Sequence, residues 1–548
     1  MERSRNTRRL IDCLMESGAA TSIRATKTPV LSCGTMEAAM PQSASADTIR
    51  SRKPLIGWHQ GVAPRWPEDE TAENAPMTQA DRPLTPLRDL CGPRSLPVLG
   101  NLHQIRFDRL HLTLENWAER YGPIYAIRIG PQRIAVISER SAIQRVLVQR
   151  PSAFRRTAML ESVAAEMRLK GVFAAEGEDW RRQRRMVVSA LNRAKLRDFF
   201  PRLAVTVGRL RRRWERAAYR GEPVNLRRDL MRFTVDVTVQ LAFGVDANTL
   251  ETPVPVIQRH LDKVFPVLHR RVNAPFPWWR LVRLPSDRAL NRALDALEWE
   301  VQAMVRETRR RMAAEPERCA APTNFLEAIL AAVEDGEAGF TDAEIFANAG
   351  TLLLAGEDTT ANTIAWTVHC FTKHPGYFER ARREVDALLA PEPAIGSLEQ
   401  TAKLAFLDAF CNEVMRLKPV APLLVFEPVA DTELLGCRVP KGTPLMLLTR
   451  RMATRDENFA DGDRLDPDRW LVAPRSDERA HDRSAFAPFG GGPRLCPGRS
   501  LALLQIRTVL AMLCRNFEVE PVHSGNDVDE HLAFTMMPAE LSVHLSRR

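Results

Sequence analysis

The sequence predicts a mainly helical fold with a small β part (α+β), formed by one large domain. Long helical patterns of apolar residues dominate between residues 141 and 389. Short β-like segments occur before that stretch, at 124–137, and after it, at 419–449. Neither an internal repeat nor a linker follows Leu90, so residues 86–548 are expected to form a single domain. A chain of this length would usually form several domains of roughly 100–200 residues each, but the continuous helical pattern favours a single one.

The composition is that of an ordinary globular protein. Hydrophobic residues make up 45% and charged residues 27%, which excludes a mainly disordered or collagen-like chain. Nine cysteines are too few for a disulfide scaffold and indicate a reduced, intracellular protein. The best apolar run, Thr351–Gly356, ends at Glu357 and is far shorter than the roughly 18–20 residues of a membrane span. The N-terminus also lacks the apolar core of a secretory signal, so we expect a soluble, cytoplasmic protein without a transmembrane anchor.

The chain is basic, with 78 Lys and Arg against 68 Asp and Glu and a net charge of +10. Arginine runs at 181–185, 211–213 and 309–311 contribute to this balance. No zinc-finger spacing or other nucleic-acid motif accompanies them, so no nucleic-acid partner is expected. Two interpretations stay open, namely solvated helix faces and a docking surface for an acidic protein.

The first elements follow in order from the N-terminus. Residues 1–85 are rich in Ala, Ser, Thr, Arg and Pro without a sustained period, which predicts a disordered extension, and Met77 would suit a native start. The Pro- and Gly-punctuated segment 91–100 opens the domain, and a helix-like stretch then leads to Tyr121. Residues 124–129 and 133–137 flank a Gly-Pro pair and predict a β-hairpin.

Two later helices have clear boundaries in the sequence. Thr341 with Glu344 three residues later is a capping box, so a helix is expected from there to His374. A final helix is expected from Arg499 to Phe517. These two helices contain or adjoin the segments in which chemically active residues concentrate.

The most informative segment is 489–498, with the sequence Phe-Gly-Gly-Gly-Pro-Arg-Leu-Cys-Pro-Gly. Its glycines allow tight turns and let backbone amides approach a ligand. Cys496 precedes Pro497, a favoured first helical residue, and a helix N-terminus lowers the pKa of a thiol. No Cys-x-x-Cys spacing accompanies Cys496, which argues against zinc or an iron–sulfur cluster. A single thiolate ligand to haem iron fits better than the alternative, a buried apolar cysteine.

This segment resembles the signature of the cytochrome P-450 superfamily of haem-thiolate monooxygenases, F-x-x-G-x-R-x-C-x-G. It matches at every fixed position, namely Phe489, Gly492, Arg494, Cys496 and Gly498. The resemblance covers roughly residues 93–545 and implies haem b (iron protoporphyrin IX) as the cofactor, with Cys496 as its axial iron ligand. It also implies that Arg494 reaches a haem propionate, that Phe489 shields the sulfur and that Gly498 lets the helix pass close under the ring.

A second motif, at residues 355–360 (Ala-Gly-Glu-Asp-Thr-Thr), lies in the middle of the long helix expected from Thr341. An acid and an alcohol inside an apolar run are costly unless they are used. The alternative is that Thr359 only bonds back to the carbonyl four residues earlier. The family carries A/G-G-x-D/E-T-T/S over the haem, and every position matches. The resemblance implies that Ala355 and Gly356 lie at the cofactor, that Thr359 holds dioxygen and that Asp358 helps relay protons.

A third motif, Glu413-x-x-Arg416, places an acid and a base on one helix face. By itself this spacing is typical of a surface ion pair. The family has it as a buried pair that an arginine of a short downstream segment completes, and residues 467–470 (Pro-Asp-Arg-Trp) match that segment. The resemblance implies that Glu413, Arg416 and Arg469 serve folding and haem retention.

A fourth motif, Trp180-x-x-x-Arg184, lies on a helix expected to open near Glu178. Taken alone, it is a cation–π pair on one helix face. The family uses W-x-x-x-R to bind a haem propionate, which implies that role for Trp180 and Arg184. The other arginines of the 181–185 cluster leave open which of them reaches the propionate.

The resemblance implies insertion of one oxygen atom from dioxygen into a lipophilic organic substrate, by hydroxylation or epoxidation. Only 548 − 498 = 50 residues follow Gly498, so no reductase module is expected in the chain. The implied electron donor is a separate ferredoxin or flavodoxin with its reductase, and the expected state is a monomer. The alternatives are a peroxide-driven haem peroxygenase, a haem-thiolate isomerase and a non-enzymatic haem sensor. The acid–alcohol pair argues against the first two.

The resemblance also locates the substrate pocket. Its walls are expected from the apolar segments 159–172, 346–356, 420–426 and 534–537, which suit a fatty acid or a terpenoid. Residues 276–281 (Phe-Pro-Trp-Trp-Arg-Leu) lie where the family has its entry lid. Lid packing and peripheral contact with a membrane surface are the two interpretations of that segment.

Overall fold

The computed structural model describes residues 84–252, 263–264, 267–268, 270–272, 274, 276–334, 339–471, 481–522 and 528–548. Most of the predicted N-terminal extension, including the candidate start at Met77, therefore lies outside the described residues. The described chain begins at Leu84, and its first strand, β1, begins at Thr85.

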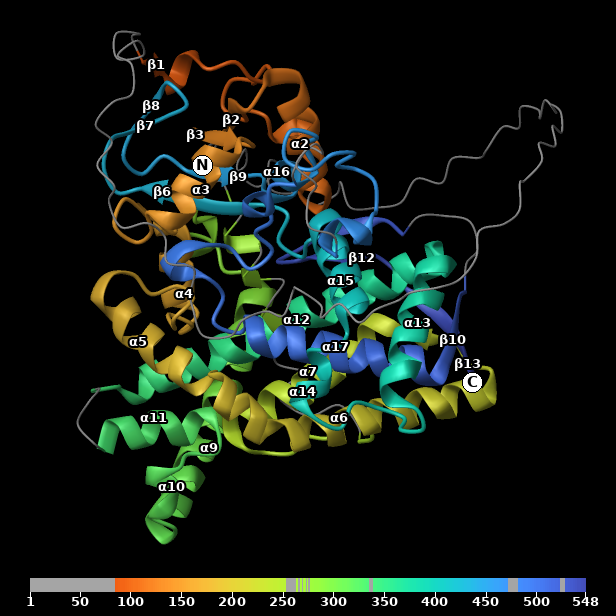
Figure 1. Cartoon of the computed structure of the whole chain (residues 1–548). Helices are drawn as coiled ribbons and strands as arrows, with labels where there is room; N and C mark the ends of the chain where they lie inside the picture. Colours follow the sequence, from red (N-terminus) through yellow and green to blue (C-terminus); the bar gives the residue numbers. More distant parts are fainter. Residues whose placement is uncertain are drawn as a thin grey trace, which may run out of the picture. The chain divides into compact units, whose positions relative to one another are not determined.

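The described chain is mainly helical, as predicted (Figure 1). The α-helices are α2 (Leu110–Tyr121), α3 (Arg140–Val148), α4 (Ala158–Glu166), α5 (Gly177–Ala190), α6 (Arg193–Arg220), α7 (Leu226–Phe243), α9 (Pro285–Ala314), α10 (Glu317–Ala320), α11 (Phe325–Glu334), α12 (Asp342–Lys373), α13 (Pro375–Leu389), α14 (Leu398–Thr401), α15 (Ala405–Leu417), α16 (Thr449–Thr454) and α17 (Arg499–Asn516). Short 3₁₀ turns are η2 (Leu87–Asp89), η3 (Leu102–Gln104), η4 (Phe107–Arg109), η5 (Trp278–Arg280), η6 (Pro467–Trp470), η7 (Arg483–Ala485) and η8 (Gly492–Arg494).

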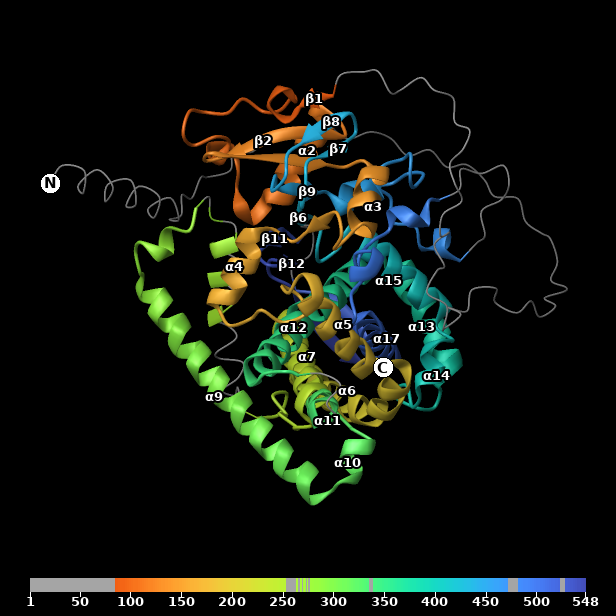
Figure 2. The same cartoon turned by 90° about the vertical axis from the view of Figure 1, so that its left-hand side faces the viewer.

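The strands form small separate sheets. They are β1 (Thr85–Pro86), β2 (Ile124–Ile129), β3 (Gln132–Ile137), β4 (Phe154–Arg155), β5 (Val224–Asn225), β6 (Leu424–Pro428), β7 (Thr432–Leu434), β8 (Cys437–Val439), β9 (Leu445–Leu447), β10 (Phe517–Pro521), β11 (Glu530–Leu532), β12 (Met536–Pro538) and β13 (Ser542–Arg547). The largest sheet has the order β2-β3-β9-β6-β4, and the others are β1-β8-β7, β10-β13-β5 and β11-β12. Strands β1–β3 and β6–β9 gather at one end of the helical body (Figures 1 and 2).

The predicted β-hairpin is confirmed. Strands β2 and β3 pair antiparallel with Ile124 opposite Ile137 and Ile129 opposite Gln132. Burial alternates along β2, whereas the last four residues of β3 are all buried. Strand β9 then joins β3 in parallel and β6 antiparallel, so the 419–449 region completes the same sheet.

Helix α12 forms the centre of the helical body, where it packs on α7 and α17 (Figure 2). Its predicted capping box is confirmed, because the Thr341 hydroxyl accepts from the Glu344 amide at 3.2 Å and the Glu344 carboxylate accepts from the Thr341 amide at 2.9 Å. Most of the helix is buried, as a core helix requires. Of the helices in the described ranges, none combines the length and the apolar character that crossing a membrane requires.

Candidate active site

The loop that carries Cys496 is shaped by its glycines. Gly492 has φ +64°, and a Cβ at that position would lie 2.4 Å from the Leu147 carbonyl oxygen, so only glycine fits. The Cys496 amide donates to the Phe489 carbonyl at 3.0 Å and closes the loop. Cys496 is an exposed residue of this loop, which argues against the alternative of a buried apolar cysteine.

The electrostatics of Cys496 differ from the sequence expectation. Helix α17 begins at Arg499, with Gly498 as its N-cap, so Pro497 is not its first residue. Although Cys496 is exposed, the surrounding protein desolvates its sulfur, and this raises the thiol pKa more than its partners lower it. Those partners are the amides of Gly498 and Arg499 and the charges of Arg184 and Arg499. A metal cation deprotonates a coordinating thiol, so it would supply the stabilisation that the backbone alone does not.

Helix α5 brings the Trp180 and Arg184 motif to the cysteine loop. Arg184 donates to the carbonyl of Leu495, the residue before Cys496. The Arg494 guanidinium lies 4.5 Å from the Trp180 ring centroid and pairs with Glu176. Two motifs more than three hundred residues apart in the chain therefore form one cluster, since Arg184 and Leu495 are 311 positions apart.

The structure distinguishes the arginines of the 181–185 cluster. Arg181 pairs with Glu178, and Arg182 pairs with Glu344 at the start of α12. Arg185 is exposed. Of this cluster, Arg184 is the one whose described contact is with the cysteine loop.

Two further arginines contribute to this region, and the sequence analysis did not identify them. Arg150 is buried, stacks 4.1 Å from the Phe426 ring centroid and donates to the Gly491 carbonyl at 3.3 Å. Arg156 lies 3.7 Å from the Phe173 ring centroid. Neither belongs to a spaced motif, and arginine is normally exposed, so the sequence alone gave no reason to select them.

These arginines carry more positive charge than the protein neutralises. Burial, with repulsion by Arg494, lowers the pKa of Arg150 to about 10. Burial, with repulsion by Arg150 and Arg494, lowers the pKa of Arg156 to about 9. The one carboxylate that acts on both is Glu176. The Nε atoms of Arg150, Arg156 and Arg494 are buried without a hydrogen-bond partner in the described part of the chain.

The central helix α12 contributes an accessible face. Leu352, Ala355, Gly356 and Thr359 retain accessible surface, whereas most residues around them are buried. Their spacing of three and four places them on one side of the helix. A Cβ on Gly356 would meet the Thr238 hydroxyl oxygen of α7 at 2.6 Å, so this glycine also permits close packing of α12 on α7.

These observations fit haem, which is flat and carries two propionates. The undercompensated arginines suit the propionates, the exposed Cys496 suits the iron, and the small residues of the α12 face suit a planar ring.

The structure separates the side chains of the acid–alcohol pair. The Thr359 hydroxyl donates to the Ala355 carbonyl at 2.9 Å, which is the alternative that the sequence left open. The Asp358 carboxylate is buried and accepts from Asn362 at 2.9 Å and from the Thr535 hydroxyl. Among the described residues, no hydrogen bond joins Asp358 to Thr359, because the two side chains leave the helix in different directions.

The third motif forms a fully buried ion cluster. Arg416 donates to both carboxylate oxygens of Glu413, at 2.7 and 2.9 Å, and Arg469 donates to the same carboxylate at 3.0 Å. The sequence analysis missed Trp470, whose indole donates to Glu413 at 2.9 Å. Arg416 also donates to the carbonyl of Ala453 at 2.9 Å, so the cluster ties α15 to α16.

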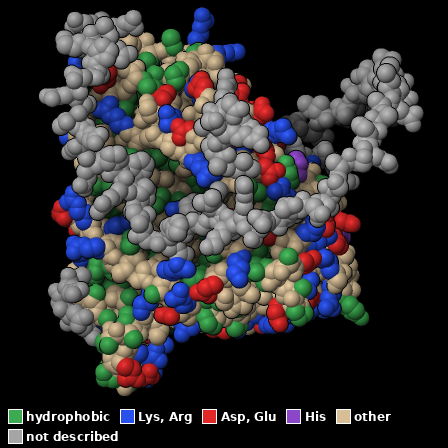
Figure 3. All heavy atoms as spheres, viewed as in Figure 1, with side chains coloured by type: hydrophobic (Ala, Val, Ile, Leu, Met, Phe, Trp, Pro, Cys, Tyr) green, Lys and Arg blue, Asp and Glu red, His purple; other side chains and the backbone are tan. Residues whose placement is uncertain are grey.

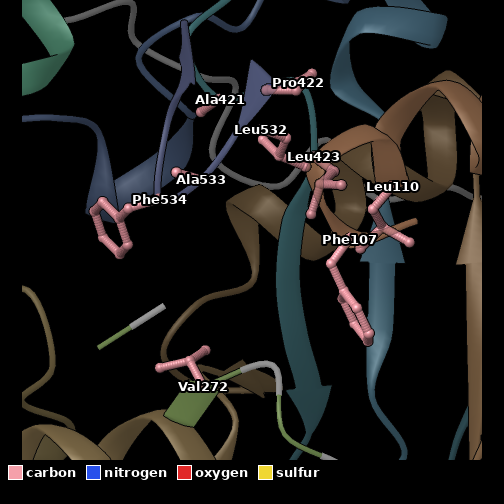
Figure 4. Close-up of a pocket in the computed structure, with 9 residues that line it drawn as sticks. All are labelled: Phe107, Leu110, Val272, Ala421, Pro422, Leu423, Leu532, Ala533 and Phe534. Carbon is pink, nitrogen blue, oxygen red and sulfur yellow. The ribbon is translucent and has the colours of Figure 1, made fainter. Parts of the chain in front are cut away.

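An apolar cavity of about 130 Å³ lies between the start of α2, the segment 421–423 and the β11–β12 hairpin (Figure 4). Four of its lining residues come from the predicted wall segments 420–426 and 534–537: Ala421, Pro422, Leu423 and Phe534. The sequence analysis missed the others: Phe107, Leu110, Val272, Leu532 and Ala533. Phe107 and Phe534 lie on opposite sides in Figure 4.

Comparison with known proteins identifies the family of the chain. The family model described as Cytochrome P450 matches residues 91–545. The chain is 26% identical over 441 residues to cytochrome P450 3A15 of Cavia porcellus, which covers 78% of this chain and 85% of that protein. It is 28% identical over 458 residues to cyclooctat-9-en-7-ol 5-monooxygenase of Streptomyces melanosporofaciens, which covers 82% and 94%. The chain therefore belongs to the cytochrome P450 family, whose members are haem-dependent monooxygenases.

Proposed function

We propose that this protein inserts one oxygen atom of dioxygen into a lipophilic organic substrate, by hydroxylation or epoxidation, with Cys496 as the axial haem ligand. The observation that carries the proposal is the meeting of an exposed cysteine with an undercompensated group of desolvated arginines. A thiolate ligand and two carboxylates of one cofactor satisfy both features together.

The residues around the loop have distinct roles in holding haem. Arg184 and Arg494 bind propionates, and Arg150 and Arg156 supply the remaining positive charge. Trp180 supports Arg494 through the stacking of its ring. Phe489, Gly492 and Gly498 shape the loop around the sulfur. When bound, haem with a thiolate ligand supplies the activation of dioxygen.

The accessible face of α12 then serves proton delivery and leaves room for the cofactor. Thr359 presents its hydroxyl on the accessible face, and its bond to the Ala355 carbonyl uses the proton, so its oxygen lone pairs remain available to a guest. Asp358 is the acid that we assign to proton delivery, and its buried carboxylate is held by Asn362 and Thr535 rather than by Thr359. Ala355 and Gly356 keep the surface small enough for a ring to lie against it.

The substrate is apolar, because every residue that lines the cavity beside β11 and β12 is apolar. The Streptomyces relative is named for oxidation of a cyclic alcohol, which is consistent with a compact lipophile. Fatty acids and terpenoids are the classes to test first.

The electron donor is a separate acidic protein of the ferredoxin or flavodoxin type. Arg181 and Arg185 are exposed on α5, the helix that contacts the cysteine loop through Arg184. A basic face next to the thiolate attracts an acidic donor and shortens the electron path.

The test combines a ligand assay with turnover. The reduced holoprotein under carbon monoxide is expected to show the strongly red-shifted Soret band of a thiolate-ligated haem, Cys496→Ser to lose it, and the control Cys91→Ser to keep it. Turnover is then measured with NADPH, a surrogate ferredoxin with its reductase, and a panel of fatty acids and terpenes. Reductant-dependent product supports the proposal. Product formed only with hydrogen peroxide would make the protein a peroxygenase, and haem binding without any product would make it a sensor.

A further inference from the structure

The buried acid of α12 is held by a distant hairpin. The Thr535 hydroxyl donates to Oδ2 of Asp358, and the Asn362 amide donates to both Oδ1 of Asp358 and the Thr535 oxygen, at 2.9 and 3.1 Å. Arg227 of α7 lies 3.7 Å from Oδ1. Asp358, Asn362 and Thr535 are all buried, so Thr535 is the described hydrogen-bond donor to Oδ2.

Thr535 lies in the tip of the β11–β12 hairpin. The strands pair with Leu532 opposite Met536, and the tip is closed by the bond from the Ala533 amide to the Thr535 carbonyl at 3.0 Å. The base of the hairpin is fixed, because Glu530 pairs with His111, Lys418 and Arg450. Met536, next to the tip, is held as well, because its amide donates to the Val420 carbonyl at 2.8 Å and its carbonyl accepts from the Trp366 indole at 3.3 Å.

The same tip lines the apolar cavity. Leu532, Ala533 and Phe534 contribute to its wall, and Thr535 follows directly in the chain (Figure 4). The Phe534 ring meets Phe173 edge to face, with centroids 6.2 Å apart. A small molecule that fills the cavity contacts Ala533 and Phe534, and Thr535, whose hydroxyl donates to Asp358, follows them directly.

We propose that Thr535 is a positioning residue that couples occupancy of this cavity to the orientation of Asp358. The proposal rests on the proposed function for the proton-feeding role of Asp358, but the coupling itself is a property of the chain. Asp358 and the hairpin tip move together, so a seated guest and a correctly aimed acid occur in the same conformation.

The energetic reason is the cost of an unpaired buried carboxylate oxygen. If the tip moves away from α12, Oδ2 loses its donor in a buried site, and such a loss is expensive. The carboxylate therefore follows the hydroxyl or resists the movement. Coupling of this kind is reciprocal, so a change at Asp358 must alter both the tip and the affinity of the cavity for a guest.

The experiment uses the haem-loaded full chain. The variants are Thr535→Val, which keeps the shape without the hydroxyl, Thr535→Ser, which restores it, Asp358→Asn, and the double variant. Thr367→Val is the control, because Thr367 is buried in the same helix and donates only to the Thr363 carbonyl, at 2.8 Å. Amide hydrogen exchange of residues 530–538 is measured, together with the affinity for dodecanoic acid from its effect on the Soret band.

Thr535→Val is expected to speed exchange at the tip by about fivefold or more, a typical size for coupling between two sites. Thr535→Ser is expected to restore the wild-type rate and Thr367→Val to leave it unchanged. Asp358→Asn is expected to speed the same amides, with little further change in the double variant. If dodecanoic acid binds, its affinity should change with the same pattern.

Additive effects of Thr535→Val and Asp358→Asn on exchange, or no effect of Asp358→Asn on the tip, would overturn the coupling. Since exchange needs no substrate, it decides whether Thr535 and Asp358 are coupled even if no product is found in the turnover panel, and exchange with and without dodecanoic acid tests the link to occupancy of the cavity. In that case the proposed function fails and the coupling stands or falls by itself. A fall in affinity without any change in exchange would make Thr535 an ordinary wall residue.

Discussion

Single residues of this site owe their chemistry to their neighbours. Cys496 has its thiol pKa raised by desolvation, and the same environment lowers the pKa values of the arginines around it. Both shifts disfavour charge in the protein alone. A cofactor that brings a cation to the sulfur and anions to the arginines would stabilise the charged forms of both.

The first prediction at this scale concerns Thr359. Thr359→Ala removes the hydroxyl from the accessible face of α12 without touching the iron ligand, so the carbon monoxide spectrum should stay normal. Product should fall relative to reductant consumed and hydrogen peroxide should rise, since positioned proton transfer is typically worth about 10²–10⁴-fold. Thr367→Ala removes a hydroxyl with the same kind of backbone bond and should change neither quantity. An unchanged product ratio in Thr359→Ala would reduce Thr359 to a helix residue.

The second concerns Arg150. If its charge serves a propionate, Arg150→Gln should speed transfer of haem to apomyoglobin by about tenfold, the size of one hydrogen bond to a charged group. The apoprotein should melt no lower than the wild type, because the repulsion from Arg494 is relieved. Arg145→Gln, on the exposed side of α3, should change neither. A less stable apoprotein with normal haem retention would assign Arg150 a structural role only.

At the scale of elements, ion clusters fix how helices and strands meet. Glu413, paired with Arg416 on the same helix, joins α15 to η6 through Arg469 and Trp470. Glu530 joins β11 to α2, α16 and the end of α15 in the same manner. Both carboxylates have several donors, which is the condition under which a buried charge is tolerated.

Glu413→Ala leaves Arg416 and Arg469 buried without their shared carboxylate. Breaking such a pair costs about 3–5 kcal/mol, a large share of a domain's stability. We expect insoluble or haem-free protein, measured as the ratio of Soret to protein absorbance after purification. Glu399→Ala, an exposed partner of Arg197, is the matched control and should express normally. Full haem content in Glu413→Ala would show that the cluster is dispensable.

The lowered pKa of Glu530 predicts how the stability of the protein depends on pH. Burial raises its pKa, but His111, Arg450 and Lys418 outweigh burial and hold the pKa well below its ordinary value. A depressed pKa gives stability that is present above the unfolded value of about 4.3 and is lost as the pH falls below it. Glu530→Gln should therefore melt below the wild type at pH 7, and this difference should shrink as the pH falls below about 4. A difference that stays constant down to pH 3 would contradict this electrostatic account.

At the scale of the whole molecule, the excess positive charge does not by itself define a binding face. The net charge is +10, yet basic and acidic side chains intersperse on the face shown in Figure 3. Arg182 and Arg184 are partly buried, whereas Arg181, which pairs with Glu178, and Arg185 are the exposed arginines of the α5 cluster. Partner attraction is thus expected from a local patch.

This patch gives a prediction about salt. Reduction by a surrogate ferredoxin should slow steeply as salt rises, because the Debye length falls to about 8 Å at physiological ionic strength. Arg181→Glu combined with Arg185→Glu should lower the second-order rate at low salt by about tenfold or more. Arg310→Glu, on the exposed side of α9, should have little effect. A flat salt dependence with an inert double variant would place the donor elsewhere.

Local pattern was enough to determine the hairpin, the capping box of α12, the mainly helical fold and the family signature, because each depends on residues close in sequence. The partners of the chemical groups were decided only by tertiary structure. Thr535 reaches Asp358 across 177 positions, and Arg150 reaches Gly491 across 341. The thiol pKa of Cys496 likewise depends on desolvation by the fold. Periodicity and spacing report which face a side chain takes, whereas burial and long-range partners exist only once distant segments have packed together.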